Sequence, residues 1–235
     1  MTHKGVILIE PIEDLVSRIR EINKNGPTLI EGAGSGKYGL ALERELGIEK
    51  NSSKKPDFRG IEIKTKATSK LQTLFSRTPS EYLSCGDRLG TLRKYGYENK
   101  DGRTQLYTSV NHDGDSLGFR IVVLAGQVIL KRGPESVLSY ENTRLTKALK
   151  SKHSESAFVT VKPVNHNTTY YYPTLQHCRE PSFEKFLILL RSSKIYLDLT
   201  LSVKNGVAKD HGFLWRIPSD ELPNLFEHIE EYALM

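Results

Sequence analysis

The chain has 235 residues, 37% hydrophobic and 26% charged, which is typical of a globular protein large enough for one sizeable domain or two lobes. It carries 34 Lys and Arg against 28 Asp and Glu, a net charge of +6 that favours a polyanionic partner such as nucleic acid. Cys85 and Cys178 lack the spacing of a disulfide framework or a zinc site. No apolar run suits a signal peptide or a membrane span, so we expect a cytoplasmic protein.

The first predicted element is a helix over residues 11–24, which begins with Pro11 in its first turn. One apolar stripe defines it: Ile12, Leu15, Val16, Ile19 and Ile22. A second helix is predicted over residues 38–46, ending at Gly47.

A glycine-rich loop at residues 31–37 precedes that second helix. It does not have the spacing of a phosphate-binding P-loop, because Glu31 stands where glycine is required and Tyr38 where Ser or Thr is required. We interpret it as a hinge or as a loop that lies against a backbone.

The most informative segment covers residues 55–66 and reads Lys-Pro-Asp-Phe-Arg-Gly-Ile-Glu-Ile-Lys-Thr-Lys. Its isoleucines alternate with charged residues at the period of a half-buried strand, so Glu62 and Lys64 share one face. Gly60 lets the chain bend and bring Asp57 back over that pair. Two carboxylates beside an ammonium form a hard-oxygen site for Mg²⁺ and suit phosphodiester hydrolysis, which indicates a nuclease.

The alternative interpretation of this segment is an ordinary sheet with a solvated charged face, since such strings also occur by chance. Pro56 directly before the aspartate, the β-branched residues on either side of Glu62 and the basic chain favour the nuclease.

Further elements are expected downstream of the motif. Helices are predicted at 80–94, 137–149 and 182–191, the last capped by Ser182, and a final helix follows Ser219. Strands are predicted at 107–110, 118–124, 127–131, 157–164, 168–172, 195–203 and 214–217, with a hairpin turn at Gly126, a polar turn at 165–167 and a loop at 204–213. The mixture indicates an α/β or α+β protein with an inserted β-rich middle.

The residues resemble a known family. Pro56-Asp57-Phe58, Ile61 to Thr65 and the Leu71 to Pro79 segment are similar to the MvaI and BcnI group of type II restriction endonucleases, which is related to the mismatch-repair nicking enzyme MutH. The segment from Gly39 to Gly47 resembles a helix of that family, and Asp210 to Ile217 resembles its C-terminal recognition loop and following strand. The matches cover roughly residues 26–97 and 183–232.

The resemblance implies a restriction-endonuclease α/β fold: a mixed sheet flanked by helices, with two lobes that form a DNA cleft. We expect one nuclease domain, with a catalytic lobe at about 1–100 and a recognition lobe at about 183–235, each joined by part of the middle.

It also implies the roles of the motif residues. Asp57 and Glu62 would hold the metal, and Lys64 would orient or activate the attacking water. Glu43 would be an auxiliary acid on its helix, although a solvated glutamate is the alternative and Glu45 lies nearby.

The expected partner is double-stranded DNA. In the recognition loop, Asp210 and His211 could hydrogen-bond base edges, although a lone histidine in a polar loop is often only surface. Phosphate contacts are predicted for Arg77, Arg93, Lys94 and Lys209, each of which could instead be a solubilising charge. The remaining DNA-binding candidates are Lys66, Ser76 and Arg216.

The order Asp210-His211-Gly212, and Ser76 where BcnI has a histidine, favour a target of the CCWGG kind. Such a target has an odd central base pair that a two-fold dimer cannot read identically from both strands, so the resemblance implies a monomer that nicks the strands in turn. A cognate DNA methyltransferase is expected in the host, without direct contact. The alternatives are a MutH-like nicking enzyme and a catalytically silent DNA-binding module.

Overall fold

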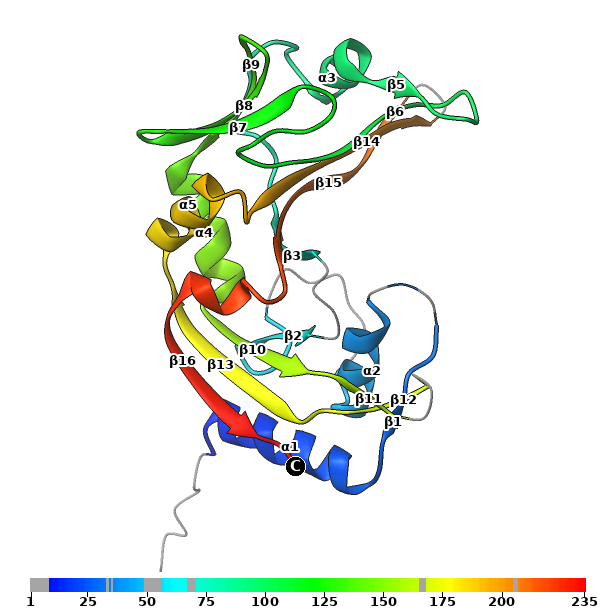
Figure 1. Ribbon diagram of the computed structural model, residues 1–235, viewed down its shortest axis with the longest axis vertical. Coiled ribbons are helices and arrows are strands. Elements are labelled where there is room, and N and C mark those ends of the chain that lie inside the picture. Colours follow the sequence, from blue (N-terminus) through cyan, green and yellow to red (C-terminus); the bar gives the residue numbers. More distant parts are fainter. Residues whose placement is uncertain are drawn as a thin grey trace, which may run out of the picture. The chain divides into compact units, whose positions relative to one another are not determined.

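The computed structural model describes residues 9–32, 34, 36–48, 56–66, 71–164, 168–204 and 207–235, with the backbone alone at 204 and 207–211. The chain divides into two compact units (Figure 1). The first unit comprises Met1–Ser69, Lys152–Pro181 and Phe226–Met235, and the second comprises Lys70–Ser151 and Ser182–Leu225. Residues 70–100 belong to the second unit, and the last ten residues belong to the first.

The helices of the described residues are α1 (Pro11–Lys24), α2 (Lys37–Glu45), α3 (Arg88–Tyr95), α4 (Asn142–His153), α5 (Phe183–Arg191) and the short 3₁₀ helix η1 (Leu222–Leu225). No helix in these ranges is long and apolar enough to cross a membrane.

The first unit is built on a mixed sheet with the strand order β16-β13-β10-β2, in which β10 and β2 run parallel and the other neighbours are antiparallel. A smaller antiparallel sheet has the order β1-β12-β11. The bounds are β1 (Thr28–Leu29), β2 (Glu62–Lys66), β10 (Glu155–Thr160), β11 (Lys162–Val164), β12 (Thr169–Tyr171), β13 (Thr174–Pro181) and β16 (Phe226–Ala233).

The second unit contains two antiparallel sheets, with the orders β3-β15-β14-β6-β5 and β4-β9-β8-β7. The bounds are β3 (Leu71–Ser76), β4 (Glu81–Tyr82), β5 (Tyr97–Glu98), β6 (Thr104–Val110), β7 (Phe119–Leu124), β8 (Gln127–Arg132), β9 (Glu135–Glu141), β14 (Tyr196–Lys204) and β15 (Val207–Pro218).

Helix α1 runs along one face of the mixed sheet (Figure 1). Its stripe packs in one cluster with Ile63 of β2 and with Ala157 and Val159 of β10, and Leu15 and Ile19 are fully buried there. Because successive strand residues point to opposite faces, this packing turns Glu62 and Lys64 toward the other face of β2. The core of the first unit thus fixes the direction of the charged motif.

Several predicted elements are confirmed. The first helix has the predicted bounds, and Ser182 caps α5 by accepting a hydrogen bond from the backbone N–H of Lys185. Strands β7 and β8 form the predicted hairpin, and Gly126 between them has a positive φ of 84°. The predicted polar turn at 165–167 lies outside the described residues.

The prediction of a C-terminal helix is wrong. A single 3₁₀ turn covers Leu222–Leu225, and the chain then enters β16, which pairs with β13 from Phe226 to Ala233. Leu222, Leu225, Phe226 and Ile229 match a helical period by coincidence. Pairing with β13 satisfies the backbone groups of this segment and overrides that period.

Two other helices are shorter than predicted. Helix α3 begins at Arg88 because the side chain of Asp87 caps it, accepting from the N–H of Gly90, and residues 81–82 form β4 instead. Helix α4 begins at Asn142, because Val137 and its neighbours form β9 between β4 and β8. Cross-strand pairing thus wins over the local helical pattern in both segments.

The predicted loop at 204–213 is also corrected, because β15 already begins at Val207 and pairs with β14 up to Lys204. The register places two residues of β15, His211 and Gly212, opposite Thr200 of β14, which is a β-bulge. Gly212 has a φ of 101°, and its carbonyl accepts a 2.6 Å hydrogen bond from the Thr200 hydroxyl.

Candidate active site

A tight turn positions Asp57 against strand β2. Phe58 and Ile61 exchange two backbone hydrogen bonds of 2.9 and 2.8 Å, and both intervening residues, Arg59 and Gly60, have positive φ. The Arg59 guanidinium lies 3.2 Å from the carboxylate of Asp14 on α1, which ties the turn to that helix. The Asp57 carboxylate then accepts a hydrogen bond from the N–H of Ile63 at 3.1 Å.

Glu62 is buried to 1% exposure, although it lies on the charged face of its strand. Lys64 donates a hydrogen bond to its Oε1, and the Nζ of Lys152 lies 2.6 Å from its Oε2. Burial of this carboxylate between two ammonium groups excludes the interpretation of the motif as the solvated face of an ordinary sheet.

Glu43 reaches the same region from α2. A side chain built at Gly39 would lie 3.8 Å from both Glu43 Oε1 and Thr65 Oγ1, so the carboxylate lies beside the end of β2. Burial raises the pKa of Glu43, and the negative charge of Asp57 raises it further. Burial likewise raises the pKa of Asp57, followed by the charge of Glu62. The three carboxylates therefore repel one another across a partly buried site.

This arrangement fits a divalent metal ion. Within the described part of the chain, no group of three His, Cys, Asp or Glu side chains forms a ready metal cage. However, among the described residues Glu62 Oε2 is paired with the ammonium of Lys152 at 2.6 Å and has no further hydrogen-bond partner. A buried carboxylate that is balanced by side-chain ammonium groups, beside carboxylates with raised pKa, offers oxygen atoms that a hard cation could bind.

Lys152 is the residue of this site that the sequence did not reveal. It lies at the end of α4, immediately before β10, and its side chain is 22% exposed. The pattern Lys-Ser-Lys-His carries no local signal, because the contact depends on β10 running parallel to β2. A βαβ crossover that follows the motif strand could have indicated it.

Three DNA-binding candidates lie in or next to these strands: Lys66 ends β2, Ser76 ends β3, and Arg77 directly follows it. The Nζ of Lys66 donates to Gln176 Oε1 at 2.7 Å, which holds this ammonium on the sheet of the first unit. Ser76 is exposed in the second unit. Arg77 is half-buried, its backbone N–H donates to Phe213, and its Nε has no hydrogen-bond partner among the described residues.

Two other candidates on α3 differ in their surroundings. Arg93 is exposed, whereas the ammonium of Lys94 donates a hydrogen bond to Glu135. On β15, Arg216 donates to the Asp198 carboxylate at 2.7 Å and to the Leu71 carbonyl at 2.6 Å. Arg93 is therefore more available for a phosphate contact than either of the others.

The candidates Lys209, Asp210 and His211 lie in β15, where the structure describes their backbone alone. Their strand passes close to Ser76: a side chain at Gly212 would come within 2.6 Å of the Ser76 hydroxyl. The structure thus brings two of the predicted recognition segments together within the second unit.

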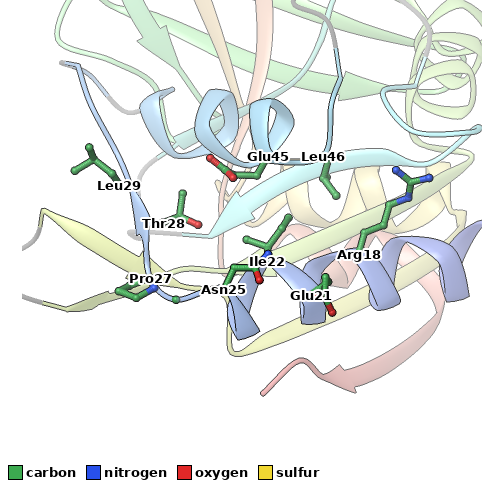
Figure 2. Close-up of a pocket in the computed structure, with 10 residues that line it drawn as sticks. Arg18, Glu21, Ile22, Asn25, Pro27, Thr28, Leu29, Glu45 and Leu46 are labelled. Atoms are coloured by element: carbon green, nitrogen blue, oxygen red, sulfur yellow. The ribbon is translucent and has the colours of Figure 1, made fainter.

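The surface hollows of the first unit include the following two. One, of about 440 Å³, is formed by the end of α1, the residues around β1 and the end of α2, and Figure 2 shows its lining. Asp57, Glu62 and Lys64 are not part of it. The other, of about 520 Å³, is lined in part by Glu43 and Lys37. The predicted metal ligands thus lie outside both hollows.

The family is decided by comparison with known proteins. The model of the MvaI/BcnI restriction endonuclease family matches residues 16–226. The chain belongs to the MvaI/BcnI restriction endonuclease family. It is therefore a type II site-specific deoxyribonuclease that acts on double-stranded DNA, and membership implies the use of a divalent metal ion.

Solved structures agree with the fold of this restriction endonuclease. The chain is similar to a complex of restriction endonuclease MvaI with cognate DNA, with a TM-score of 0.77 and 20% identity over 97% of this chain and 100% of that one. It is also similar to MvaI in the absence of DNA, with a TM-score of 0.59 and 19% identity over 95% and 98% of the two chains. A search of curated proteins found no match.

Proposed function

We propose that this restriction endonuclease is Mg²⁺-dependent and that Asp57 and Glu62 hold the metal ion. The observation that carries the proposal is Glu62, a carboxylate buried to 1% exposure on the same short segment as the carboxylate of Asp57. The turn at residues 58–61 and the bond from Ile63 hold Asp57 beside it. When bound, Mg²⁺ would polarise the scissile phosphate and lower the pKa of a coordinated water.

Lys64 orients the attacking water in this proposal. Lys64 is on the same strand face as Glu62, and its side chain is 23% exposed, so it can reach solvent while Glu62 fixes its position. It would orient the water for attack on phosphorus, as the bond from phosphorus to the leaving oxygen breaks. Glu43 would act as an auxiliary acid, because its raised pKa makes proton exchange easier near neutral pH than for an ordinary glutamate.

We further propose a short pseudopalindromic target such as CCWGG, read by one chain. Support comes from the Asp210-His211-Gly212 sequence, from Ser76 beside that strand, and from a single Asp57–Glu62–Lys64 set per chain. A monomer with one such set would nick one strand and then the other. The enzyme would act in the cytoplasm, where a cognate DNA methyltransferase would protect host DNA without contacting it.

Digestion of supercoiled plasmid with Mg²⁺, followed by mapping of the ends, tests the proposal. We expect an open-circle intermediate, then linear DNA with ends at one short sequence, from a protein that sediments as a monomer with and without a short cognate duplex. A stable dimer that cuts both strands in one binding event would contradict the monomer. Accumulation of nicked plasmid alone would favour a MutH-like nicking enzyme, and intact plasmid would favour a silent DNA-binding module.

A further inference from the structure

Glu62 is held by two lysines, one on each carboxylate oxygen. Lys64 belongs to the family motif and contacts Oε1, whereas Lys152 comes from α4 and contacts Oε2 at 2.6 Å. With Glu62 at 1% exposure, both ammonium groups act where water screens charge poorly. One buried negative charge thus has two positive neighbours, and Lys152 is the neighbour of Oε2, which has no further hydrogen-bond partner among the described residues.

The position of Lys152 is fixed by the connection that follows it. His153 and Ser156 are both fully buried, and the His153 Nδ1 lies 3.0 Å from the Ser156 hydroxyl. Ser156 is the residue of β10 that pairs with Glu62 in the parallel register. A short, hydrogen-bonded link therefore joins the residue after Lys152 to the immediate neighbour of Glu62.

We propose that Lys152 is a positioning residue of the metal site, whose ammonium occupies Glu62 Oε2 in the metal-free enzyme and yields that oxygen to the divalent ion. The inference rests on the proposed role of Glu62 as a metal ligand. In the metal-free state the ammonium compensates a buried carboxylate that would otherwise be costly. It also competes with the ion, because two cations cannot share one carboxylate oxygen without repulsion.

This competition has a consequence for the enzyme. The competition predicts weak metal binding to the protein alone, and DNA phosphate oxygens would then supply the additional ligands. Lys152 thereby favours assembly of the active site on DNA. A residue that merely stabilised the fold around Glu62 would have the opposite effect on metal affinity, since its loss would loosen the ligand.

The test is calorimetric titration of Ca²⁺ into the full chain without DNA. We expect Lys152→Met to tighten Ca²⁺ binding by about 10-fold, because a unit positive charge is removed within a few ångströms of the ion. Lys152→Arg should weaken binding several-fold, because a guanidinium can hold both carboxylate oxygens. Lys150→Met, an exposed lysine on the same helix, should leave the affinity unchanged.

Unchanged or weaker Ca²⁺ binding by Lys152→Met would overturn the inference. If this variant does not fold, Lys152→Arg decides: weaker binding than wild type supports the competition, and equal or tighter binding refutes it. Asp57→Asn separates the two proposals, because it should abolish Ca²⁺ binding if the metal site is correctly assigned. Ca²⁺ binding by wild type that Asp57→Asn does not affect, or no binding at all, would reject the metal site and the role of Lys152 together.

Discussion

The Asp57 carboxylate accepts a 3.1 Å hydrogen bond from the backbone N–H of Ile63, six residues further along the chain. The strand that carries Glu62 and Lys64 thus also holds Asp57, so one short segment defines the relative positions of all three groups. The same closeness gives Asp57 a raised pKa, by burial first and by the charge of Glu62 second. The site is therefore assembled at a cost to the stability of the metal-free protein.

Replacing Asp57 by Asn should stabilise the metal-free protein at neutral pH. A carboxyl whose folded pKa lies above its unfolded value favours folding below the unfolded pKa and loses that contribution as the pH rises through the folded pKa. At pH 7 the ionised Asp57 is thus unfavourable, and Asn still accepts the bond from Ile63. Thermal melting in EDTA should show a higher Tm, by about 2–4 °C for each kcal/mol relieved.

Two controls apply to the predicted gain in Tm: its pH dependence and the same substitution at a second aspartate. The gain in Tm should shrink as the pH falls toward the ordinary aspartate pKa of about 4. Asp14→Asn should give no gain, because the hydrogen bond from Arg18 lowers the pKa of Asp14 and so makes its ionised form favourable. An equal Tm for wild type and Asp57→Asn at pH 7 would show that the ionised Asp57 carboxylate does not destabilise the protein.

The auxiliary role of Glu43 predicts that substitutions of two glutamates on α2 have different effects on the cleavage rate. Glu43→Gln should slow plasmid cleavage roughly 10- to 100-fold, as expected for a group that supports a metal site from its surroundings. Glu45→Gln is the matched control, since Glu45 contacts Arg44 and is not among the main causes of the raised pKa of Asp57 or Glu43. Equal rates for both variants would mean that Glu43 is a solvated helix residue.

Lys64→Ala should reduce the cleavage rate by at least about 100-fold, and Lys64→Arg should restore little of it. Arginine keeps the charge, but it loses protons much less readily and its planar fork differs in shape from an ammonium. Single-turnover kinetics with saturating Mg²⁺ would measure the effect. A cleavage rate of Lys64→Arg within a few-fold of wild type, about 1 kcal/mol of barrier, would mean that Lys64 supplies only a positive charge.

The exposed Arg93 should contact a DNA phosphate. Arg93→Ala is expected to weaken binding to all sequences alike and to reduce the slope of log affinity against log salt by roughly one unit. Lys24→Ala is the control, because α1 covers the sheet face opposite Glu62 and Lys64. A slope unchanged in Arg93→Ala would mean that the DNA path does not pass Arg93.

The sequence was sufficient for the local part of the site. Asp57, Glu62 and Lys64 are brought together by strand alternation and by one glycine turn, both of which depend on neighbours within a few residues. The first helix was equally predictable, since its apolar stripe packs on a single sheet face.

Contacts between distant segments could not be predicted in this way. Lys152 reaches Glu62 only because β10 lies parallel to β2, a pairing that no local pattern encodes. The C-terminal segment has apolar residues at helical spacing, yet its pairing with β13 makes it a strand. Likewise, pairing with β14 extends β15 back to Val207 through glycine-containing sequence that reads as a loop.

The most direct test of the account is plasmid cleavage by Asp57→Ala and Glu62→Ala beside wild type, with DNA binding measured in Ca²⁺. We predict that each variant cuts at least about 100-fold more slowly in Mg²⁺. Both should still bind specific DNA measurably, because the predicted DNA contacts come from other side chains. Full cutting activity in either variant would contradict the assignment of the active site.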